Sequence, residues 1–96
     1  EIYGIQSDIK LASSINIKTD LSLTDKLISY TKAVEGNVYL SGISGRQYLE
    51  FDKFSDVDIQ IHSFQHPEYI QTGISFVKNL SILDYLFNEG DKPWWE

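Results

Sequence analysis

Two stretches of this chain alternate apolar and polar residues with the period of a half-buried β-strand. The first runs from Asp8 to Ile17 and the second from about Asp56 to Phe64. Successive side chains of a strand point to opposite faces, so the alternation indicates that one face of each segment packs against a core. A shorter run from Asn37 to Leu40 is rich in β-branched and aromatic residues. The pattern therefore predicts a strand in each of these three segments.

A helix is predicted between the first and second of these strands. The sequence Ser22-Leu-Thr-Asp25 has the spacing of a capping box, in which the serine hydroxyl accepts from a free backbone N–H and the acid reaches back to the cap. Apolar residues then fall near one helical face up to Glu35. Because glycine adopts the left-handed conformation readily, Glu35-Gly36 is expected to end a helix over Leu23–Glu35.

A second helix and the fold class follow from the same kind of pattern. Ser81-Ile-Leu-Asp84 repeats the capping-box spacing, so a helix is predicted over Ser81–Asn88, ended by Gly90. A strand, a helix and a strand in sequence form a βαβ unit, whose right-handed crossover would make the strands at 8–17 and 37–40 parallel. The predicted fold class is α/β, a small sheet containing this βαβ unit with helices packed on it.

Charge and composition exclude several classes of function. Fourteen acidic residues against eight basic ones give a net charge of -6, so the basic surface that nucleic-acid binding needs is missing. The absence of cysteine excludes disulfides and thiolate metal sites and favours a reducing cytoplasm. No apolar run approaches the ~18 residues of a membrane span. We therefore expect a cytoplasmic protein that binds neither nucleic acid nor membrane.

The length and the two ends of the chain suggest a portion of a longer protein. Ninety-six residues without a repeat or a linker are expected to form a single domain over residues 1–96. The chain contains no methionine and starts with Glu1, a residue too large for ordinary removal of an initiator methionine ahead of it. We therefore expect that further protein precedes this segment.

The aromatic residues are interpreted as packing groups. Tyr69 and Tyr85 are expected in the core or at its rim. Trp94 and Trp95, which follow Pro93, stand in an otherwise polar tail. Two exposed indoles forgo roughly 2–3 kcal/mol each. At least one of them should therefore pack against its own domain or a neighbour.

A glycine-containing loop after a predicted strand is the first candidate binding site. Gly42 and Gly45 stand three residues apart, and Arg46, the only arginine, opens a predicted short helix. In parallel α/β sheets, ligands bind at the carboxyl ends of strands, where exposed N–H groups and the helix dipole favour anions. Ser41 and Ser44 would add hydroxyl donors, and Arg46 a two-point contact to a phosphate or carboxylate. The alternative is a tight turn whose glycines satisfy backbone geometry only.

His66 is the candidate catalytic residue. It lies at the end of the predicted third strand beside the rigid Pro67, and histidine is the side chain best suited to exchanging protons near neutral pH. We interpret it as a general base or acid, with a histidine that holds the turn by hydrogen bonds as the alternative. His62, the other histidine, is expected to be exposed on the strand. Two histidines without a third ligand make a poor zinc site, so no metal is expected, and no cofactor either.

Three blocks of residues have an order and spacing that match a known family. The blocks are Tyr39-Leu-Ser-Gly42 with Gly45 and Tyr48-Leu49, then Phe64-Gln-His-Pro67 with Tyr69 and Gln71, then Asn79-Leu-Ser-Ile-Leu-Asp84 with Leu86-Phe-Asn88 and Gly90. Together they resemble the C-terminal half of the WbqC-like proteins over about Ile9 to Gly90. Lys78 departs from the family pattern, in which we expect a proline, and the family's N-terminal half is absent.

The resemblance implies a place in metabolism and a reaction class. WbqC-like proteins are bacterial and are often encoded beside genes for surface-polysaccharide, or O-antigen, and amino-sugar synthesis. A sugar-modifying transferase is implied, which transfers an acyl or aminoacyl group to the amine of a small-molecule substrate, a nucleotide-linked amino sugar. The alternatives are a nucleotide- or sugar-binding module without chemistry, and a structural portion that packs against the missing N-terminal half.

Overall fold

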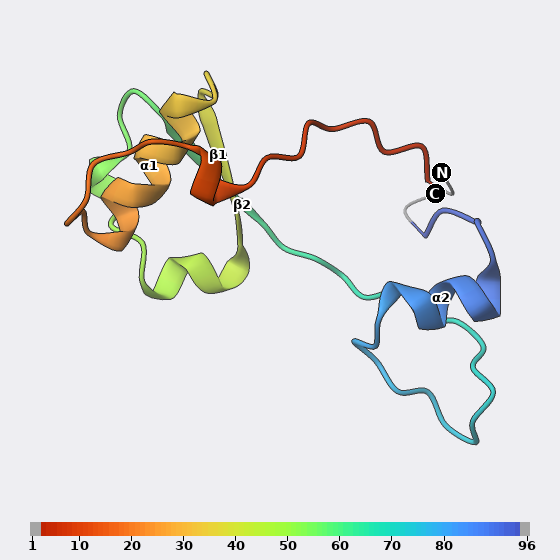
Figure 1. The fold of residues 1–96 in the computed structure, drawn as a ribbon. Helices are drawn as coiled ribbons and strands as arrows, with labels where there is room; N and C mark the ends of the chain where they lie inside the picture. Colours follow the sequence, from red (N-terminus) through yellow and green to blue (C-terminus); the bar gives the residue numbers. More distant parts are fainter. Residues whose placement is uncertain (1–2, 95–96) are drawn as a thin grey trace. The chain divides into compact units, whose positions relative to one another are not determined.

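The computed structural model describes residues 3–94, which form parts of two compact units (Figure 1). Unit 1 combines Glu1–Asp8 with Gln65–Glu96, and Unit 2 is the continuous segment Ile9–Phe64. His66 therefore belongs to Unit 1, whereas the glycine-containing loop belongs to Unit 2. The single domain expected over residues 1–96 stays a prediction.

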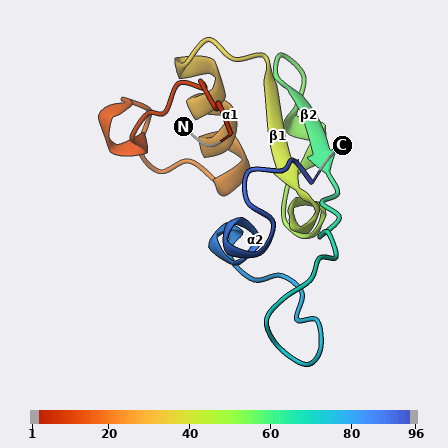
Figure 2. The ribbon, with the colours of Figure 1, turned by 90° about the vertical axis from the view of Figure 1, so that its right-hand side faces the viewer.

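Unit 2 is built on a two-stranded parallel sheet. Strand β1 (Val38–Gly42) pairs with strand β2 (Asp58–His62), with Val38 beside Asp58 and Gly42 beside His62. Helix α1 (Leu23–Ala33) packs next to β1 (Figure 2). The predicted α/β class, a small parallel sheet with helix packing, is confirmed.

The start of α1 follows the sequence pattern closely. The Ser22 hydroxyl donates to Asp25 Oδ2 at 2.9 Å and accepts from the Asp25 N–H at 3.3 Å, so the predicted cap forms. The helix ends two residues earlier than expected. Glu35 takes the left-handed conformation (φ 61°) and Gly36 does not, so the prediction that the glycine supplies it is wrong. At Gly36 a Cβ would lie 3.1 Å from Thr31 O, so glycine here permits close backbone approach.

The prediction of a strand over Asp8–Ile17 is wrong. The segment contains a short 3-10 helix, Ala12–Ser14, and no strand, and it leaves Ile9 and Leu11 91% and 74% exposed. Alternation tells which side chains share a face, but a strand also needs a partner whose backbone completes the hydrogen-bond ladder. The Ser14 N–H and hydroxyl instead both donate to Leu11 O, at 3.0 and 2.7 Å, which closes a local turn.

The connection between the two parallel strands also differs from the prediction. Because the first strand is missing, α1 makes no crossover, and the chain passes from β1 to β2 through residues 43–57. Two short 3-10 helices, Ile43–Gln47 and Phe51–Lys53, replace the short helix expected in this region. Hydrogen bonds to α1 hold this connection in place: the Glu50 N–H donates to Thr24 Oγ1 at 3.1 Å. Thr24 itself is only 1% exposed.

Unit 1 contains helix α2 (Ile82–Glu89), close to the range predicted. The Ser81 hydroxyl accepts from the Leu83 N–H at 3.1 Å, and Gly90 ends the helix with φ 69°. Tyr85, on α2, is 6% exposed and is the buried apolar residue of this unit in the described part of the chain.

The prediction that at least one of the two C-terminal tryptophans packs against protein is confirmed by Trp94. Its ring meets those of Tyr3 and Tyr85 edge to face, each with ring centroids 5.6 Å apart, and the side chain is half-buried. Trp95 lies outside the described residues. None of the helices formed by residues 3–94 is long and apolar enough to cross a membrane.

Candidate functional site

Two residues of the glycine-containing loop are used for packing. Ser41 is 5% exposed, and its hydroxyl donates to Gly42 O at 2.9 Å. Gly45 is buried, and a Cβ built on it would overlap Ser41 Oγ and come within 2.9 Å of Leu49 Cδ1. Gly45 is thus needed because side chains crowd its Cα, a reason distinct from both positive φ and ligand approach.

The other three candidate binding residues of the loop face solvent. Gly42 has nothing within 4 Å of a built Cβ, and Ser44 and Arg46 are exposed. Glu50, four residues beyond Arg46, pairs with Lys53 at 3.0 Å. The predicted anion contacts of Ser41, Gly42, Ser44, Gly45 and Arg46 stay predictions, with the exposed members the better placed to make them.

The two glycines of the loop offer a matched pair of substitutions. Gly45→Ala is expected to lower the free energy of unfolding by about 1–3 kcal/mol, the usual cost of overpacking. Gly42→Ala is expected to raise it by about 0.4–1 kcal/mol, because its φ of -69° suits alanine and the unfolded chain loses entropy. Urea unfolding followed by far-ultraviolet circular dichroism measures both. Equal effects of the two substitutions would contradict this account of Gly45.

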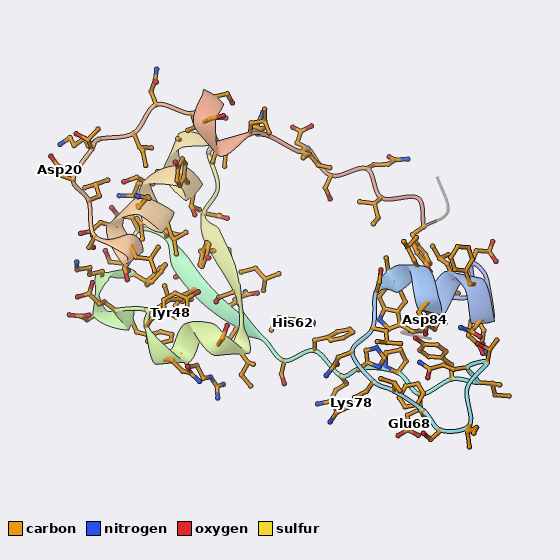
Figure 3. All side chains as sticks on the ribbon, turned by 60° about the horizontal axis from the view of Figure 1, so that its bottom comes forward. Asp20, Tyr48, His62, Glu68, Lys78 and Asp84 are labelled. Atoms are coloured by element: carbon orange, nitrogen blue, oxygen red, sulfur yellow. The ribbon has the colours of Figure 1, made fainter. Side chains whose placement is uncertain are left out.

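A second polar cluster lies in Unit 1 around the carboxylate of Asp84, on α2 (Figure 3). Its Oδ2 accepts from the Tyr69 hydroxyl at 2.6 Å and from Gln71 Nε2 at 3.0 Å. Asn88 Nδ2 donates to the backbone O of Asp84 at 2.8 Å and lies 3.4 Å from its Oδ1. The capping role predicted for Asp84 is therefore wrong, because its side chain is turned toward residues far upstream and leaves the cap to the Ser81 hydroxyl alone.

His66 lies against the aromatic part of this cluster. It is half-buried, and its ring centroid is 6.1 Å from that of Tyr69 and 5.9 Å from that of Phe76. Tyr69 also meets Phe76 and Tyr85 edge to face, at 5.4 and 5.0 Å. The ring of His66 is therefore held beside a tyrosine whose hydroxyl is itself fixed by Asp84.

The hydrogen bond to Asp84 also determines how Tyr69 titrates. This bond is the main cause that raises the pKa of Tyr69 above its ordinary value of 10.0, and desolvation adds to it. Tyr69 therefore stays a neutral hydroxyl donor at physiological pH. Its part in the cluster is to position neighbours rather than to accept a proton.

The raised pKa of Tyr69 predicts a limit to stability at alkaline pH. A group whose folded pKa is raised contributes its full stabilisation below its unfolded pKa and loses it as pH rises through the folded value. Unit 1 should therefore lose stability above pH 10.0, the ordinary pKa of tyrosine. The difference in tyrosinate absorbance between wild type and Tyr69→Phe isolates this titration. A midpoint at or below 10.0 would contradict the Asp84 bond, and Asp84→Asn should move the midpoint down.

The sequence indicates His66 as the candidate catalytic residue, a role that stays a prediction, but it does not indicate the neighbours of His66. The sequence predicts packing for Tyr69 and helix capping for Asp84, and it predicts no role for Gln71 or Asn88. All four nevertheless fall in the blocks that carried the resemblance, which was the one feature of the sequence able to find them. His66 lies in Unit 1 and Arg46 in Unit 2.

Metal binding has no visible basis in the part of the chain that the structure describes. Residues 3–94 contain no group of three or more histidine, cysteine, aspartate or glutamate side chains able to hold a metal ion. His62, at the end of β2, is exposed as expected and lies in Unit 2 (Figure 3).

Comparison with known proteins supports the resemblance found in the sequence. The model of the WbqC-like protein family matches residues 1–94, which include all three sequence blocks. No curated protein and no solved structure matches this chain.

Proposed function

The chain belongs to the WbqC-like protein family, and on this premise we propose that it modifies an amino sugar in bacterial surface-polysaccharide synthesis. The reaction is the transfer of an acyl or aminoacyl group to the amine of a nucleotide-linked amino sugar. His66 acts as the general base of this transfer. Separately, the exposed residues Gly42, Ser44 and Arg46 give Unit 2 a surface suited to binding an anion such as a phosphate.

One observation carries the catalytic part of this proposal, namely the placement of His66. Its ring contacts those of Tyr69 and Phe76, and the Tyr69 hydroxyl is bound at 2.6 Å to Asp84 Oδ2. A general base is effective only when it is held in one orientation relative to the proton it removes. An imidazole held among oriented rings in a half-buried position supports that requirement better than one in a flexible turn does.

The chemistry needs no oxidant or reductant. The amine nitrogen of the sugar attacks the carbonyl carbon of an activated acyl donor, such as a thioester. A C–N bond forms, and the bond between the carbonyl carbon and the sulfur breaks with its electron pair leaving on sulfur. His66 takes the proton lost by the amine and returns it to the leaving thiolate.

A second candidate function is favoured by the surface of α2. Leu83 and Phe87 lie four residues apart on one helical face and are 56% and 85% exposed. Such a face is typical of a surface that a partner or a further domain covers. This face favours the alternative in which the chain packs against other protein without performing chemistry. A nucleotide- or sugar-binding module without chemistry is the remaining alternative.

Incubation with a panel of nucleotide-linked amino sugars and acyl thioesters distinguishes the two candidates. Transfer is expected to add the mass of the acyl group to the sugar, which mass spectrometry of the small-molecule fraction detects. If sugars of the panel change the NMR spectrum of the protein but no acylated product forms, the chain is a binding module and the transferase proposal is wrong.

A further inference from the structure

A small cavity lies beside His66 within Unit 1. Its volume is about 250 Å³, and it is lined by residues of the segment 69–76, Thr72 excepted. The side chains of this segment include no acid and no base. The cavity is therefore suited to an uncharged group, because its lining residues offer no ion-pair partner to a charged one.

The walls of the cavity are fixed by hydrogen bonds at the base of the loop. Gln71 Nε2 donates to Val77 O at 2.9 Å, and the Val77 N–H donates to Gln71 Oε1 at 2.9 Å. Gln71 Nε2 also donates to Asp84 Oδ2 on α2, at 3.0 Å. Because these bonds join the two ends of the loop to each other and one end to α2, the cavity exists before any ligand binds.

The same rings form the cavity and hold the candidate base. Tyr69 and Phe76 line the cavity, and their centroids are 6.1 and 5.9 Å from that of His66. Ile70 and Ile74, which also line it, are 85% and 109% exposed, so the opening of the cavity is aliphatic and reaches solvent. A bound apolar group would remove part of this aliphatic surface from water.

We propose that this cavity binds the acyl group of the donor, and that this group is a short uncharged aliphatic chain; the inference rests on the proposed function. A cavity of about 150 Å³ lined by apolar residues is large enough for benzene. A cavity of about 250 Å³ therefore accommodates a chain of about four to six carbons. The further carbons of a long fatty acyl chain would extend into solvent and gain no contact with the cavity. An aminoacyl group is disfavoured, because its ammonium would find no carboxylate among the lining residues.

The test compares chain-length preference in wild type and Gly73→Val. Gly73 lines the cavity, and a Cβ on it would meet only Ser75 O, at 3.8 Å, so the added methyl groups should fit the fold and take space from the ligand. The donors are the acetyl, butyryl and octanoyl thioesters of N-acetylcysteamine. Wild type is expected to use the butyryl donor best. Gly73→Val should lower the butyryl-to-acetyl ratio of kcat/KM about tenfold.

A control and a binding measurement separate this inference from the proposed function. Thr72→Val changes an exposed neighbour that does not line the cavity and should leave the ratio unchanged. An unchanged ratio in Gly73→Val, with transfer intact, would overturn the inference and leave the transferase proposal standing. If no donor is transferred, titration with the butyryl thioester still decides: shifted methyl resonances of Ile70 and Ile74 support the cavity, and unshifted ones overturn it.

Discussion

Replacing His66 with glutamine is expected to lower the rate of acyl transfer by about 10²–10⁴-fold, the usual contribution of a general base. Glutamine retains a polar side chain of similar reach but cannot take a proton from the attacking amine. The ring contacts with Tyr69 and Phe76 are also lost, so circular dichroism should accompany the kinetic measurement to confirm that the fold is retained. The rate is measured as acylated sugar formed per unit time.

His62→Gln is the matched control for this substitution. His62 is the other histidine of the chain, is exposed, and lies on β2 in Unit 2. Its replacement should change the rate less than twofold, because exposed substitutions away from a site usually have small effects. Equal rates for both variants and wild type would mean that His66 holds its turn and takes no proton.

Replacing Asp84 with alanine is expected to lower the free energy of unfolding of Unit 1 by about 1.5–3 kcal/mol. The substitution removes the carboxylate that accepts from the Tyr69 hydroxyl and from Gln71 Nε2, and both donors lose an ionised partner. Alanine is the better helix former, which offsets part of the loss. Tryptophan fluorescence during urea unfolding reports on this unit, because the two tryptophans of the chain are at positions 94 and 95.

Glu68→Ala provides the comparison for Asp84→Ala. Glu68 is an exposed acid of the same unit, one residue before Tyr69. Removing its charge should change stability by less than about 0.5 kcal/mol, as is usual for surface positions. If the two variants unfold at the same urea concentration, net charge rather than the Asp84 hydrogen bonds accounts for the effect.

Features that depend on near neighbours were predictable from the sequence. The Ser22 hydroxyl and the Asp25 N–H are three residues apart, so the spacing alone determines their contact. Gly90 adopts positive φ at the end of α2 for the equally local reason that glycine has no Cβ. Both helices could therefore be placed to within about two residues.

Features that depend on residues distant in the sequence were not predictable from the sequence. The segment 8–17 alternates as a strand does, yet no other strand pairs with it among the described residues. Asp84 follows Ser81 with capping-box spacing, yet its carboxylate binds Tyr69 and Gln71, fifteen and thirteen residues upstream. A local pattern that is complete in itself gives no indication that a long-range contact will replace it.

The same distinction applies to the candidate site. His66 could be selected because its side chain chemistry and its position before Pro67 are both visible in the sequence. The structural reason for glycine at position 45 could not be predicted, since it depends on how Ser41 and Leu49 pack against Gly45 in three dimensions.

NMR titration with a uridine diphosphate-linked amino sugar, followed by the butyryl thioester, tests most directly the claim that the chemistry occurs around His66. The account predicts that the ring resonances of His66, Tyr69 and Phe76 shift as the two substrates bind, since it makes His66 the base and the other two rings lie against His66. Unchanged ring resonances at saturating substrate, with shifts confined to other residues, would contradict it.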